Sequence, residues 1–379
     1  MKKKKVILFI GHTFDLAFFM RLIPLINSDN DFEITAIVAK GKYFREMHNL
    51  GNYLKEITHS SICIQQNRIP AYSRNIIKSL FNTFRLKRKL NSQDFSSSLL
   101  ISLDKSTFLA NYLLSKFKNV ILIQTKESND NDLKKHFRIR LLRTIWFNIL
   151  NLLTNSKYTT LYVNKGSCNR VHQFRILKPE HYTIYRNLTS KRNKIILPSV
   201  ANSNKSNKVL IFGSRFYGWA YFYEYYDFNR SKIISFYTCL HELYPNYEFL
   251  YKPHPKEEGK EFDEINKVFG GKLINLGISL NAEMYLLENK DIDLCVSINS
   301  TSSISAFEMG FNSKVFYKIL KFPDSLVYDM DLRFNDAPND IFITSLDADI
   351  KNKENRSNTK SDLKYIRKIL DKSFENCDK

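Results

Sequence analysis

Short apolar runs alternate with helical patterns through the first half of this 379-residue chain. Stretches such as residues 15–25 and 106–116 carry apolar residues at helical spacing, and shorter runs between them are typical of buried strands. The strand candidates are residues 6–10, 33–38, 98–102, 120–124 and 160–163. Strands that alternate with helices form a parallel sheet with helices on both faces. We therefore expect an α/β protein.

A polar segment rich in structure-breaking residues divides the chain. Residues 197–208 contain Pro198 and the run Asn-Ser-Asn-Lys-Ser-Asn-Lys, so we place an interdomain linker there. We expect an N-terminal Rossmann-like domain over residues 1–196, a second domain over 209–352, and a C-terminal helix and tail over 353–379. A hydrophobic content of 43% is enough for two cores.

Cysteine usage and hydropathy bear on the compartment. The five cysteines show no CxxC pair and no clustering with histidine, which favours reduced thiols in the cytoplasm and argues against a zinc site. The chain has no run of eighteen apolar residues, and its lysine-rich start lacks the cleavage region of a signal peptide. We expect a cytoplasmic protein.

The formal net charge of +20 implies an anionic partner, which is nucleic acid, the anionic cytoplasmic leaflet, or a negatively charged glycan and nucleotide donor. Nucleic acid ranks last, because no zinc-finger, RRM-like or basic coiled-coil pattern accompanies the charge. The anionic inner-membrane surface ranks first. Residues 134–153 are basic and aromatic with an apolar stripe, so they either lie on that surface or form a helix packed on the protein's own sheet.

The most specific chemical signal is the sequence Lys252-Pro253-His254-Pro255, which follows a predicted strand at residues 247–251. Each proline fixes its own φ, and Pro255 also disfavours helical geometry at His254, so the imidazole has a restricted orientation. Strand C-termini in open α/β sheets are where ligands bind. We therefore expect Lys252 and His254 to face a ligand.

Three further elements share the predicted second domain. Gly213-Ser214 follows a strand and suits a tight turn beside a nucleotide, although a plain strand-to-loop turn is the alternative. Glu283 opens a helix that Asn281 caps, and it could be an ordinary first-turn glutamate. Ser300-Thr301-Ser302-Ser303 follow the predicted strand 293–298 and precede a helix, which predicts a phosphate site or a simple helix cap.

Together these elements, within residues 208–315, resemble bacterial sialyltransferases and polysialyltransferases of the GT-B type. Those enzymes move sialic acid from CMP-sialic acid onto lipooligosaccharide or capsule glycans. The resemblance implies two Rossmann-like domains that face a central cleft, with the last helix packed back across the domain junction. The cysteine usage, the net charge and the basic segment 134–153 predict further that the enzyme is cytoplasmic, lies at the periphery of the inner membrane and acts on an acceptor glycan that can be lipid-linked.

The resemblance also implies roles for individual residues. His254 would contact the CMP phosphate and act as general acid, and Glu283 would hold the ribose hydroxyls. The phosphate would be bound by Ser302 and Ser303, with Ser300 the less favoured serine. The remaining residues implied to bind the donor are Lys252, Pro255, Gly213 and Ser214.

The chain departs from the family pattern at the catalytic base. The resembling enzymes use an acidic pair followed by glycine, but the one such triplet here, Glu257-Glu258-Gly259, directly follows the histidine element and is expected to be a solvated loop. An inverting transfer still needs a base for the acceptor hydroxyl. Glu127, after the strand 120–124, has the best position, and Asp15 and Asp104 are rivals.

We therefore predict an inverting transfer of sialic acid from CMP-sialic acid, which is a co-substrate, with no other cofactor. No DxD-like carboxylate cluster ends a strand of the second domain, so we expect no metal. Teichoic-acid glycerophosphotransferases and capsular Kdo transferases share the His-Pro and paired-serine elements. One alternative therefore keeps the fold with CDP-glycerol or CMP-Kdo as donor, and another is a non-catalytic basic scaffold at the membrane surface.

Overall fold

The structure, a computed structural model, forms two compact units, Met1–Ile196 with Asp362–Lys379, and Leu197–Ser361. Apart from isolated positions between 88 and 117, it describes residues 3–28, 31–40, 49–65, 97–103, 119–124, 162–165, 170–173, 182–185, 197–201, 206–214, 220–255, 257, 259–278, 281–334, 337–345 and 363–375. The basic segment 134–153 lies outside these residues.

A six-stranded parallel sheet, in the order β3-β2-β1-β4-β5-β8, forms the first unit. Its strands are β1 (Lys4–Ile10), β2 (Phe32–Lys40), β3 (Ser60–Gln65), β4 (Leu99–Ser102), β5 (Asn119–Gln124) and β8 (Tyr182–Tyr185). Four of the five predicted strands are thereby confirmed in this sheet. β3 and β8 were not predicted from the sequence.

The fifth predicted strand, residues 160–163, belongs elsewhere. It corresponds to β6 (Tyr162–Lys165), which pairs antiparallel with β7 (Arg170–Gln173) in a separate two-stranded sheet. An antiparallel pair needs only a short connection, whereas a parallel neighbour needs a long crossover. A short apolar run does not reveal which partner it takes, so placing this strand in the parallel sheet was wrong.

Three helices of the first unit are α1 (Thr13–Ile26), α3 (Leu50–Ile57) and α12 (Leu363–Glu375). The last of these packs against α1 and β5 although it ends the chain. Phe374 stacks on Phe32 with ring centroids 5.7 Å apart, and the Lys4 ammonium lies 5.1 Å from the Phe374 ring centroid. The C-terminal helix therefore completes the core of the first unit.

The second unit holds a five-stranded sheet in the order β11-β10-β9-β12-β13, with every pair parallel. Its strands are β9 (Lys208–Phe212), β10 (Glu248–Lys252), β11 (Ile274–Asn275), β12 (Leu294–Ser297) and β13 (Ser313–Val315). The connecting helices are α7 (Ala220–Leu243), α8 (Lys260–Val268), α9 (Ala282–Glu288) and α10 (Ser302–Glu308). After β13 come η2 (Tyr317–Ile319), α11 (Asp324–Phe334) and η3 (Asn339–Ile341).

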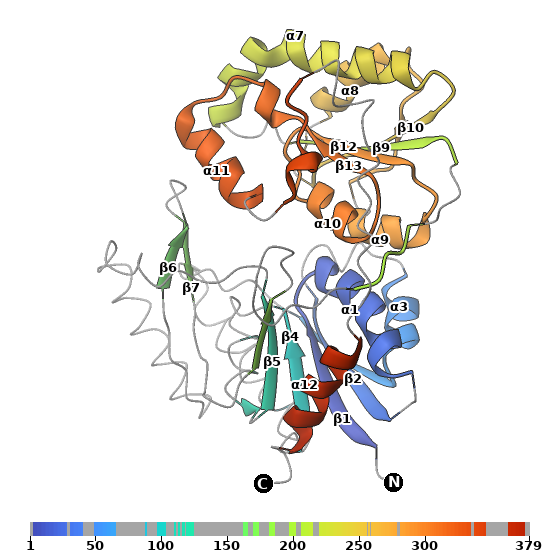
Figure 1. Cartoon of the computed structure of the whole chain (residues 1–379), viewed down its shortest axis with the longest axis vertical. Coiled ribbons are helices and arrows are strands. Elements are labelled where there is room, and N and C mark those ends of the chain that lie inside the picture. The colour runs from blue at the N-terminus through green and yellow to red at the C-terminus, as the bar shows by residue number, and fades with distance from the viewer. Residues whose placement is uncertain are drawn as a thin grey trace. The chain divides into compact units, whose positions relative to one another are not determined.

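Helices cover both faces of the second sheet, with α7 and α8 on one side and α9 and α10 on the other (Figure 1). Alternate strand residues serve the two sides, as the pleat requires. Leu210, Phe212 and Leu250 pack with apolar residues of α9 and α10. Phe249 and Tyr251 instead contact the rings of Phe269, which directly follows α8, and of Phe262, which lies within it. Each unit is thus Rossmann-like, and the predicted α/β architecture is confirmed.

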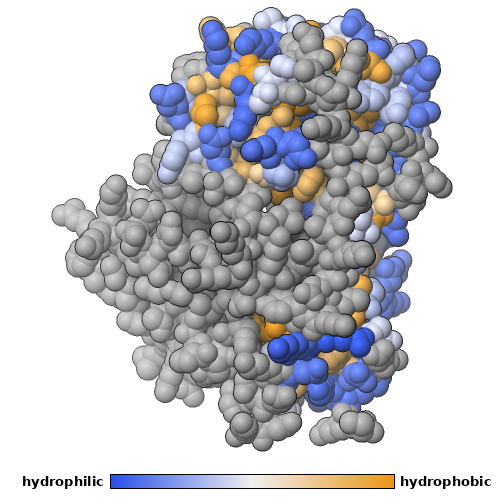
Figure 2. Space-filling model, viewed as in Figure 1, coloured by the Kyte–Doolittle hydropathy of each residue, from blue (hydrophilic) through white to orange (hydrophobic). Residues whose placement is uncertain are grey.

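The visible face of the second unit shows apolar residues interspersed with hydrophilic ones (Figure 2). Among the described residues the large apolar side chains that are exposed are Phe228, Ile274, Ile278 and Tyr328. No helix within the described part of the chain is both long enough and apolar enough to cross a membrane.

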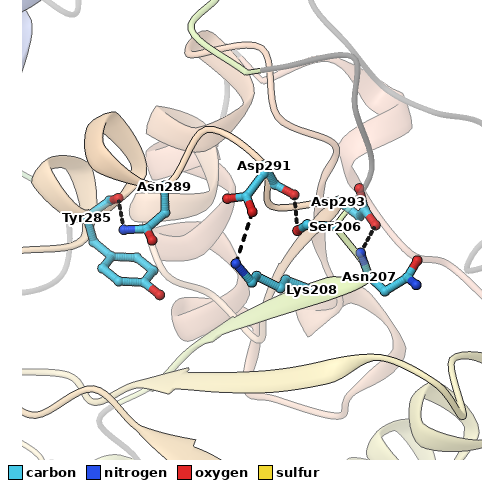
Figure 3. Close-up of polar contacts among 7 residues, drawn as sticks. All are labelled: Ser206, Asn207, Lys208, Tyr285, Asn289, Asp291 and Asp293. Carbon is cyan, nitrogen blue, oxygen red and sulfur yellow. Dashed lines mark hydrogen bonds and ion pairs between the residues drawn. The ribbon is translucent and has the colours of Figure 1, made fainter.

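Polar contacts fix the amino-terminal edge of the second sheet, where β9 and β12 begin (Figure 3). Lys208 pairs with Asp291 at 2.9 Å, and the Ser206 hydroxyl donates to the Asp291 carbonyl. The Asn207 N–H donates to Asp293 Oδ2 at 2.9 Å, and its carbonyl accepts from the Glu248 N–H at 2.8 Å. Asn207 has a φ of 58°, a left-handed conformation that asparagine tolerates better than most residues.

We expect Asn207→Ala to lower the free energy of unfolding of the second unit by about 1 kcal/mol, because alanine adopts a left-handed conformation at a cost. Asn207→Gly removes the same side chain without that cost, so its effect should stay within about 0.5 kcal/mol. Urea denaturation of both variants measures the difference. Equal destabilisation would show that the side chain of Asn207, and not its backbone conformation, carries the effect.

Candidate functional site

Three loops meet at the carboxyl edge of the second sheet because β9, β10 and β12 are parallel neighbours. Phe212 is in register with Lys252 on one side and with Ser297 on the other. The loops that start at Gly213, Pro253 and Ile298 therefore leave the sheet at the same level. From β9 the chain builds β10 and β11 on one side and then crosses to β12 on the other, so the topological switch point lies between β9 and β12. Ligands of open α/β sheets bind at this position.

Lys252, the last residue of β10, is a buried cation with 4% of its surface exposed. Its ammonium donates to the Pro253 carbonyl at 2.5 Å. Burial lowers the pKa of Lys252 to about 8, and the negative charges of Glu257 and Glu283 oppose that decrease. A lysine in this state lies at the point where an anion would meet the sheet edge.

His254 and Pro255 follow in a tight turn, with His254 half-buried and Pro255 exposed. The turn is closed by Glu257, whose N–H donates to the His254 carbonyl at 2.8 Å. In return the Glu257 carboxylate accepts from the His254 N–H at 2.9 Å and from the Tyr251 hydroxyl at 3.0 Å. Glu257 is only 8% exposed, so the expectation of a solvated loop at this residue was wrong. Its carboxylate is drawn inward because these donors compensate for lost hydration.

Gly213 lies directly against this turn. Its N–H donates to the Lys252 carbonyl at 2.8 Å. A Cβ atom at position 213 would lie 2.5 Å from Glu257 Oε2, 2.6 Å from the Tyr251 hydroxyl and 3.0 Å from the His254 nitrogen. The absence of a side chain thus makes room for the histidine turn itself. The sequence had indicated room for a nucleotide, whereas the structure fills that space with Glu257.

Ser214 lies at the switch point and is 5% exposed. Among the described residues its hydroxyl has no hydrogen-bond partner. A buried hydroxyl without a partner costs stability, which a ligand atom at hydrogen-bonding distance would restore. Ser214 is therefore the clearest polar group here that a bound ligand would satisfy.

Glu283 stands in the first turn of α9, and the predicted cap is confirmed because Asn281 Oδ1 accepts from the Met284 N–H at 3.0 Å. The carboxylate is 9% exposed and close enough to Lys252 to raise the pKa of that lysine. Glu283 therefore belongs to the same edge of the sheet as the histidine turn, where its charge acts on the buried cation.

The serine turn divides into inner and outer hydroxyls. Ser303 is fully buried, its Oγ lies 2.8 Å from Ser297 Oγ, and its carbonyl accepts from the Ser313 hydroxyl at 2.8 Å. These bonds give Ser303 a place inside the turn, away from a ligand-facing surface. Ser300 and Ser302 are half-buried, and Ser300 Oγ accepts from the Ser302 N–H at 3.3 Å. A ligand can reach this outer pair and the exposed Thr301 between them.

Of the three candidates for the catalytic base in the first unit, the structure describes one, Asp15. Glu127 and Asp104 lie outside the described residues. Asp15 is buried at the start of α1, where its Oδ2 accepts from the N–H groups of Gly11 and His12, each at 2.8 Å. Those bonds are typical of a carboxylate that stabilises a helix N-terminus, which gives Asp15 a structural role.

Sequence reasoning missed Glu257 as a member of the site. The signal was present, since a glutamate three residues after His254 can reach back to the histidine N–H across one turn. The charge of Glu257 had led us to expect an exposed side chain, because unpaired glutamates are almost never buried. Across the described residues, no three or more His, Cys, Asp or Glu side chains gather as a metal site would need.

Comparisons with known proteins give only a distant likeness. No family model and no curated protein matches the chain. A sialyltransferase GT-B domain from Photobacterium damselae is 12% identical with a TM-score of 0.45, over 90% of this chain and 98% of that one. A UDP-GlcNAc 2-epimerase from Neisseria meningitidis, bound to UDP-GlcNAc, is 11% identical with a TM-score of 0.46, over 98% and 100%.

A sialyltransferase from Photobacterium phosphoreum is also 11% identical, with a TM-score of 0.46 over 90% of this chain and 98% of that one. Transferases and epimerases thus match this chain to the same degree. Likenesses of this size assign neither a family nor a substrate.

The two kinds of serine can be separated by mutation. We expect Ser303→Ala to lower the free energy of unfolding by about 1 kcal/mol, because a buried hydrogen bond is lost. Ser302→Ala should change it by less than about 0.5 kcal/mol, since its half-buried hydroxyl makes no such bond to any residue that the structure describes. Urea denaturation measures both. An unchanged stability in Ser303→Ala would contradict the structural role given to that hydroxyl.

Proposed function

We propose that the protein is an inverting glycosyltransferase that moves sialic acid from CMP-sialic acid to a bacterial surface glycan. The observation that carries this proposal is the convergence, at the edge of the sheet that holds the switch point, of a buried lysine, a proline-flanked histidine and a buried serine hydroxyl that has no partner among the described residues. Together they form an edge suited to binding the anionic phosphate of a nucleotide donor. The motif resemblance of residues 208–315 supplies the donor.

The reaction requires cations and hydrogen-bond donors around the phosphate of the sugar donor. Transfer breaks the bond between the anomeric carbon and the phosphate oxygen, and it forms a bond from that carbon to the acceptor oxygen. The electron pair of the broken bond leaves with CMP, whose phosphate gains negative charge. Lys252 and the hydroxyls of Ser214, Ser300 and Ser302 would bind this charge, and His254 would protonate the leaving group.

Glu283 would accept hydrogen bonds from the ribose hydroxyls. Its place beside Lys252 supports this role, because phosphate and ribose are adjacent in a nucleotide. Gly213 and Pro255 would contribute by shaping the loops on either side. No metal is needed in this scheme, since Lys252 and the hydroxyls would stabilise the negative charge on the leaving phosphate.

The acceptor hydroxyl must lose its proton to a base, and Glu127 remains our candidate for it. We further propose that the protein works in the cytoplasm at the inner-membrane surface, where its charge of +20 would be attracted to anionic lipid and to a lipid-linked acceptor.

We expect His254→Asn to lower kcat for acceptor-dependent release of CMP from CMP-sialic acid by about 100-fold or more, because asparagine cannot transfer a proton. The matched control is His59→Asn, where the side chain accepts from the Ile34 N–H and asparagine can do the same. Release of CMP with and without mixed glycan acceptors is the measurement.

Other outcomes of this assay separate the alternatives. Turnover of CDP-glycerol or CMP-Kdo in place of CMP-sialic acid would keep the transferase and change its donor. No turnover of any donor, with binding to anionic vesicles equal in wild type and His254→Asn, would replace the enzyme with a non-catalytic scaffold.

The pKa of Lys252, about 8, predicts how donor binding depends on pH. The ammonium is charged below that pH, so affinity for CMP-sialic acid should fall roughly fivefold from pH 8 to 9. Stability should move the other way over that range. The unfolded chain keeps this lysine protonated to higher pH than the folded chain, so this group makes unfolding less favourable as pH rises.

Calorimetric titration with CMP-sialic acid and thermal unfolding at each pH measure the two trends. Lys252→Met should bind weakly at every pH, and Lys232→Met, which removes an exposed lysine of α7, should behave as wild type. An affinity that is flat between pH 7 and 9 in the wild type would exclude Lys252 from phosphate binding.

A further inference from the structure

A buried carboxylate, that of Glu257, contacts the backbone of the proposed acid, His254. It has no part in the chemistry described so far. Glu257 Oε1 accepts from the Tyr251 hydroxyl at 3.0 Å, and Oε2 accepts from the His254 N–H at 2.9 Å. On its remaining side the carboxylate abuts Gly213, where a Cβ atom would come within 2.5 Å of Oε2. One side chain therefore joins the ends of β9 and β10 to the histidine turn.

Keeping a carboxylate here is costly. Burial raises the pKa of Glu257, and the N–H groups of His254 and Phe262, the Tyr251 hydroxyl and the Lys252 charge oppose that increase. Burial, together with the charges of Glu257 and Glu261, also raises the pKa of the phenols of Tyr237 and Tyr251, so both remain neutral and Tyr251 keeps its proton to donate. A buried charge that needs this many partners indicates a specific use.

We propose that Glu257 is the positioning residue of this site, which holds the His254 peptide so that the imidazole meets the donor phosphate. This assignment rests on the proposed function. Two effects of one carboxylate are involved. Its hydrogen bonds fix the turn, and its negative charge supports the neighbouring cation.

Two substitutions separate these effects. Glu257→Ala removes the hydrogen bonds and the charge. Glu257→Gln removes the charge and keeps the bond to the histidine turn, because the amide oxygen can accept from the His254 N–H while the amide NH2 donates to a Tyr251 hydroxyl that has turned to accept. The structure therefore predicts different outcomes for alanine and glutamine.

With CMP-sialic acid and acceptor, we expect Glu257→Ala to lower kcat by about 100-fold, the scale of a misplaced catalytic group. Glu257→Gln should retain kcat within about fivefold at pH 7. In this variant the decrease of kcat/KM at high pH should begin below pH 8. That shift follows because Glu257 raises the pKa of Lys252, and Glu283 on α9 is then the other carboxylate that supports the charge. Glu264→Ala and Glu264→Gln are matched controls on α8, where the glutamate pairs with Arg230.

Hydrogen exchange supplies a readout that needs no turnover. Residues 253 and 255 are prolines and lack an N–H, so His254 carries the one backbone amide of residues 253–255. We expect that amide to exchange at least about tenfold faster in Glu257→Ala than in wild type, and near the wild-type rate in Glu257→Gln. Both Glu264 variants should match the wild type.

A glycine substitution tests the same contact from the opposite side. Gly213→Ala should displace the carboxylate and speed exchange at His254, because the new methyl group would overlap Oε2. In the background of Glu257→Ala, where that oxygen is gone, Gly213→Ala should add less than it does in the wild type, because only the contacts with the Tyr251 hydroxyl and the His254 nitrogen remain. Such non-additivity is expected of groups in contact.

The measured exchange rates and kinetics decide whether Glu257 positions the histidine turn and whether its hydrogen bonds and its charge act separately. Unchanged exchange at His254 in Glu257→Ala, or kcat within twofold of wild type with an unchanged pH profile, would overturn the positioning role. Equal losses in the alanine and glutamine variants would overturn the division between geometry and charge. If no donor turns over in the wild type, the proposed function fails, and the exchange rates alone decide whether Glu257 holds the turn.

Discussion

The parallel pairing of β9 with β10 and β12 is the constraint on which the candidate site depends. Parallel strands end at the same edge, and the register sets Lys252, Phe212 and Ser297 at one level. Segments more than 80 residues apart in sequence are thereby brought together at one edge. The crossing of the chain from β11 to β12 then places the switch point beside Ser214.

Charge at this edge is balanced inside the protein. Lys252 is buried with two carboxylates that raise its pKa, Glu257 and Glu283. Burial is the larger effect, so the lysine stays easier to deprotonate than one in water. A phosphate that arrives at this edge would reverse that balance, because its negative charge favours the ammonium form at close range. Binding an anion and taking up a proton are therefore linked at Lys252.

Much of this arrangement could be predicted from the sequence, since apolar runs identify strands and a parallel sheet fixes where their ends lie. The strands that end at Phe212, Lys252 and Ser297, and the cap at Asn281, are read from local patterns of this kind. Contacts between distant residues could not be read in this way. The close approach of Glu257 to Gly213 depends on how two loops fold over the sheet, and single-residue preferences favoured an exposed glutamate.

The serines show the same limit. Four hydroxyls in a row predict a polar turn but not which of them face inward, because that depends on the rotation of α10 against β12 and β13. The structure answers this with Ser303, which bonds to Ser297 at one strand end and to Ser313 at the next strand. The outer serines are left to face solvent or a ligand.

Both ends of α10 are held in place, so the serine turn is preorganised. At its far end the Met309 carbonyl accepts from the N–H groups of Val200 and Ala201, at 2.8 and 3.3 Å. Gly310 follows with a φ of +91°, where Ser199 leaves no room for a Cβ atom. With the histidine turn fixed by Glu257 and the serine turn by Ser303 and Met309, little backbone has to be ordered when a ligand binds. Interactions with developing charge are strongest where the donors are already in position, since no binding energy is then spent on ordering them.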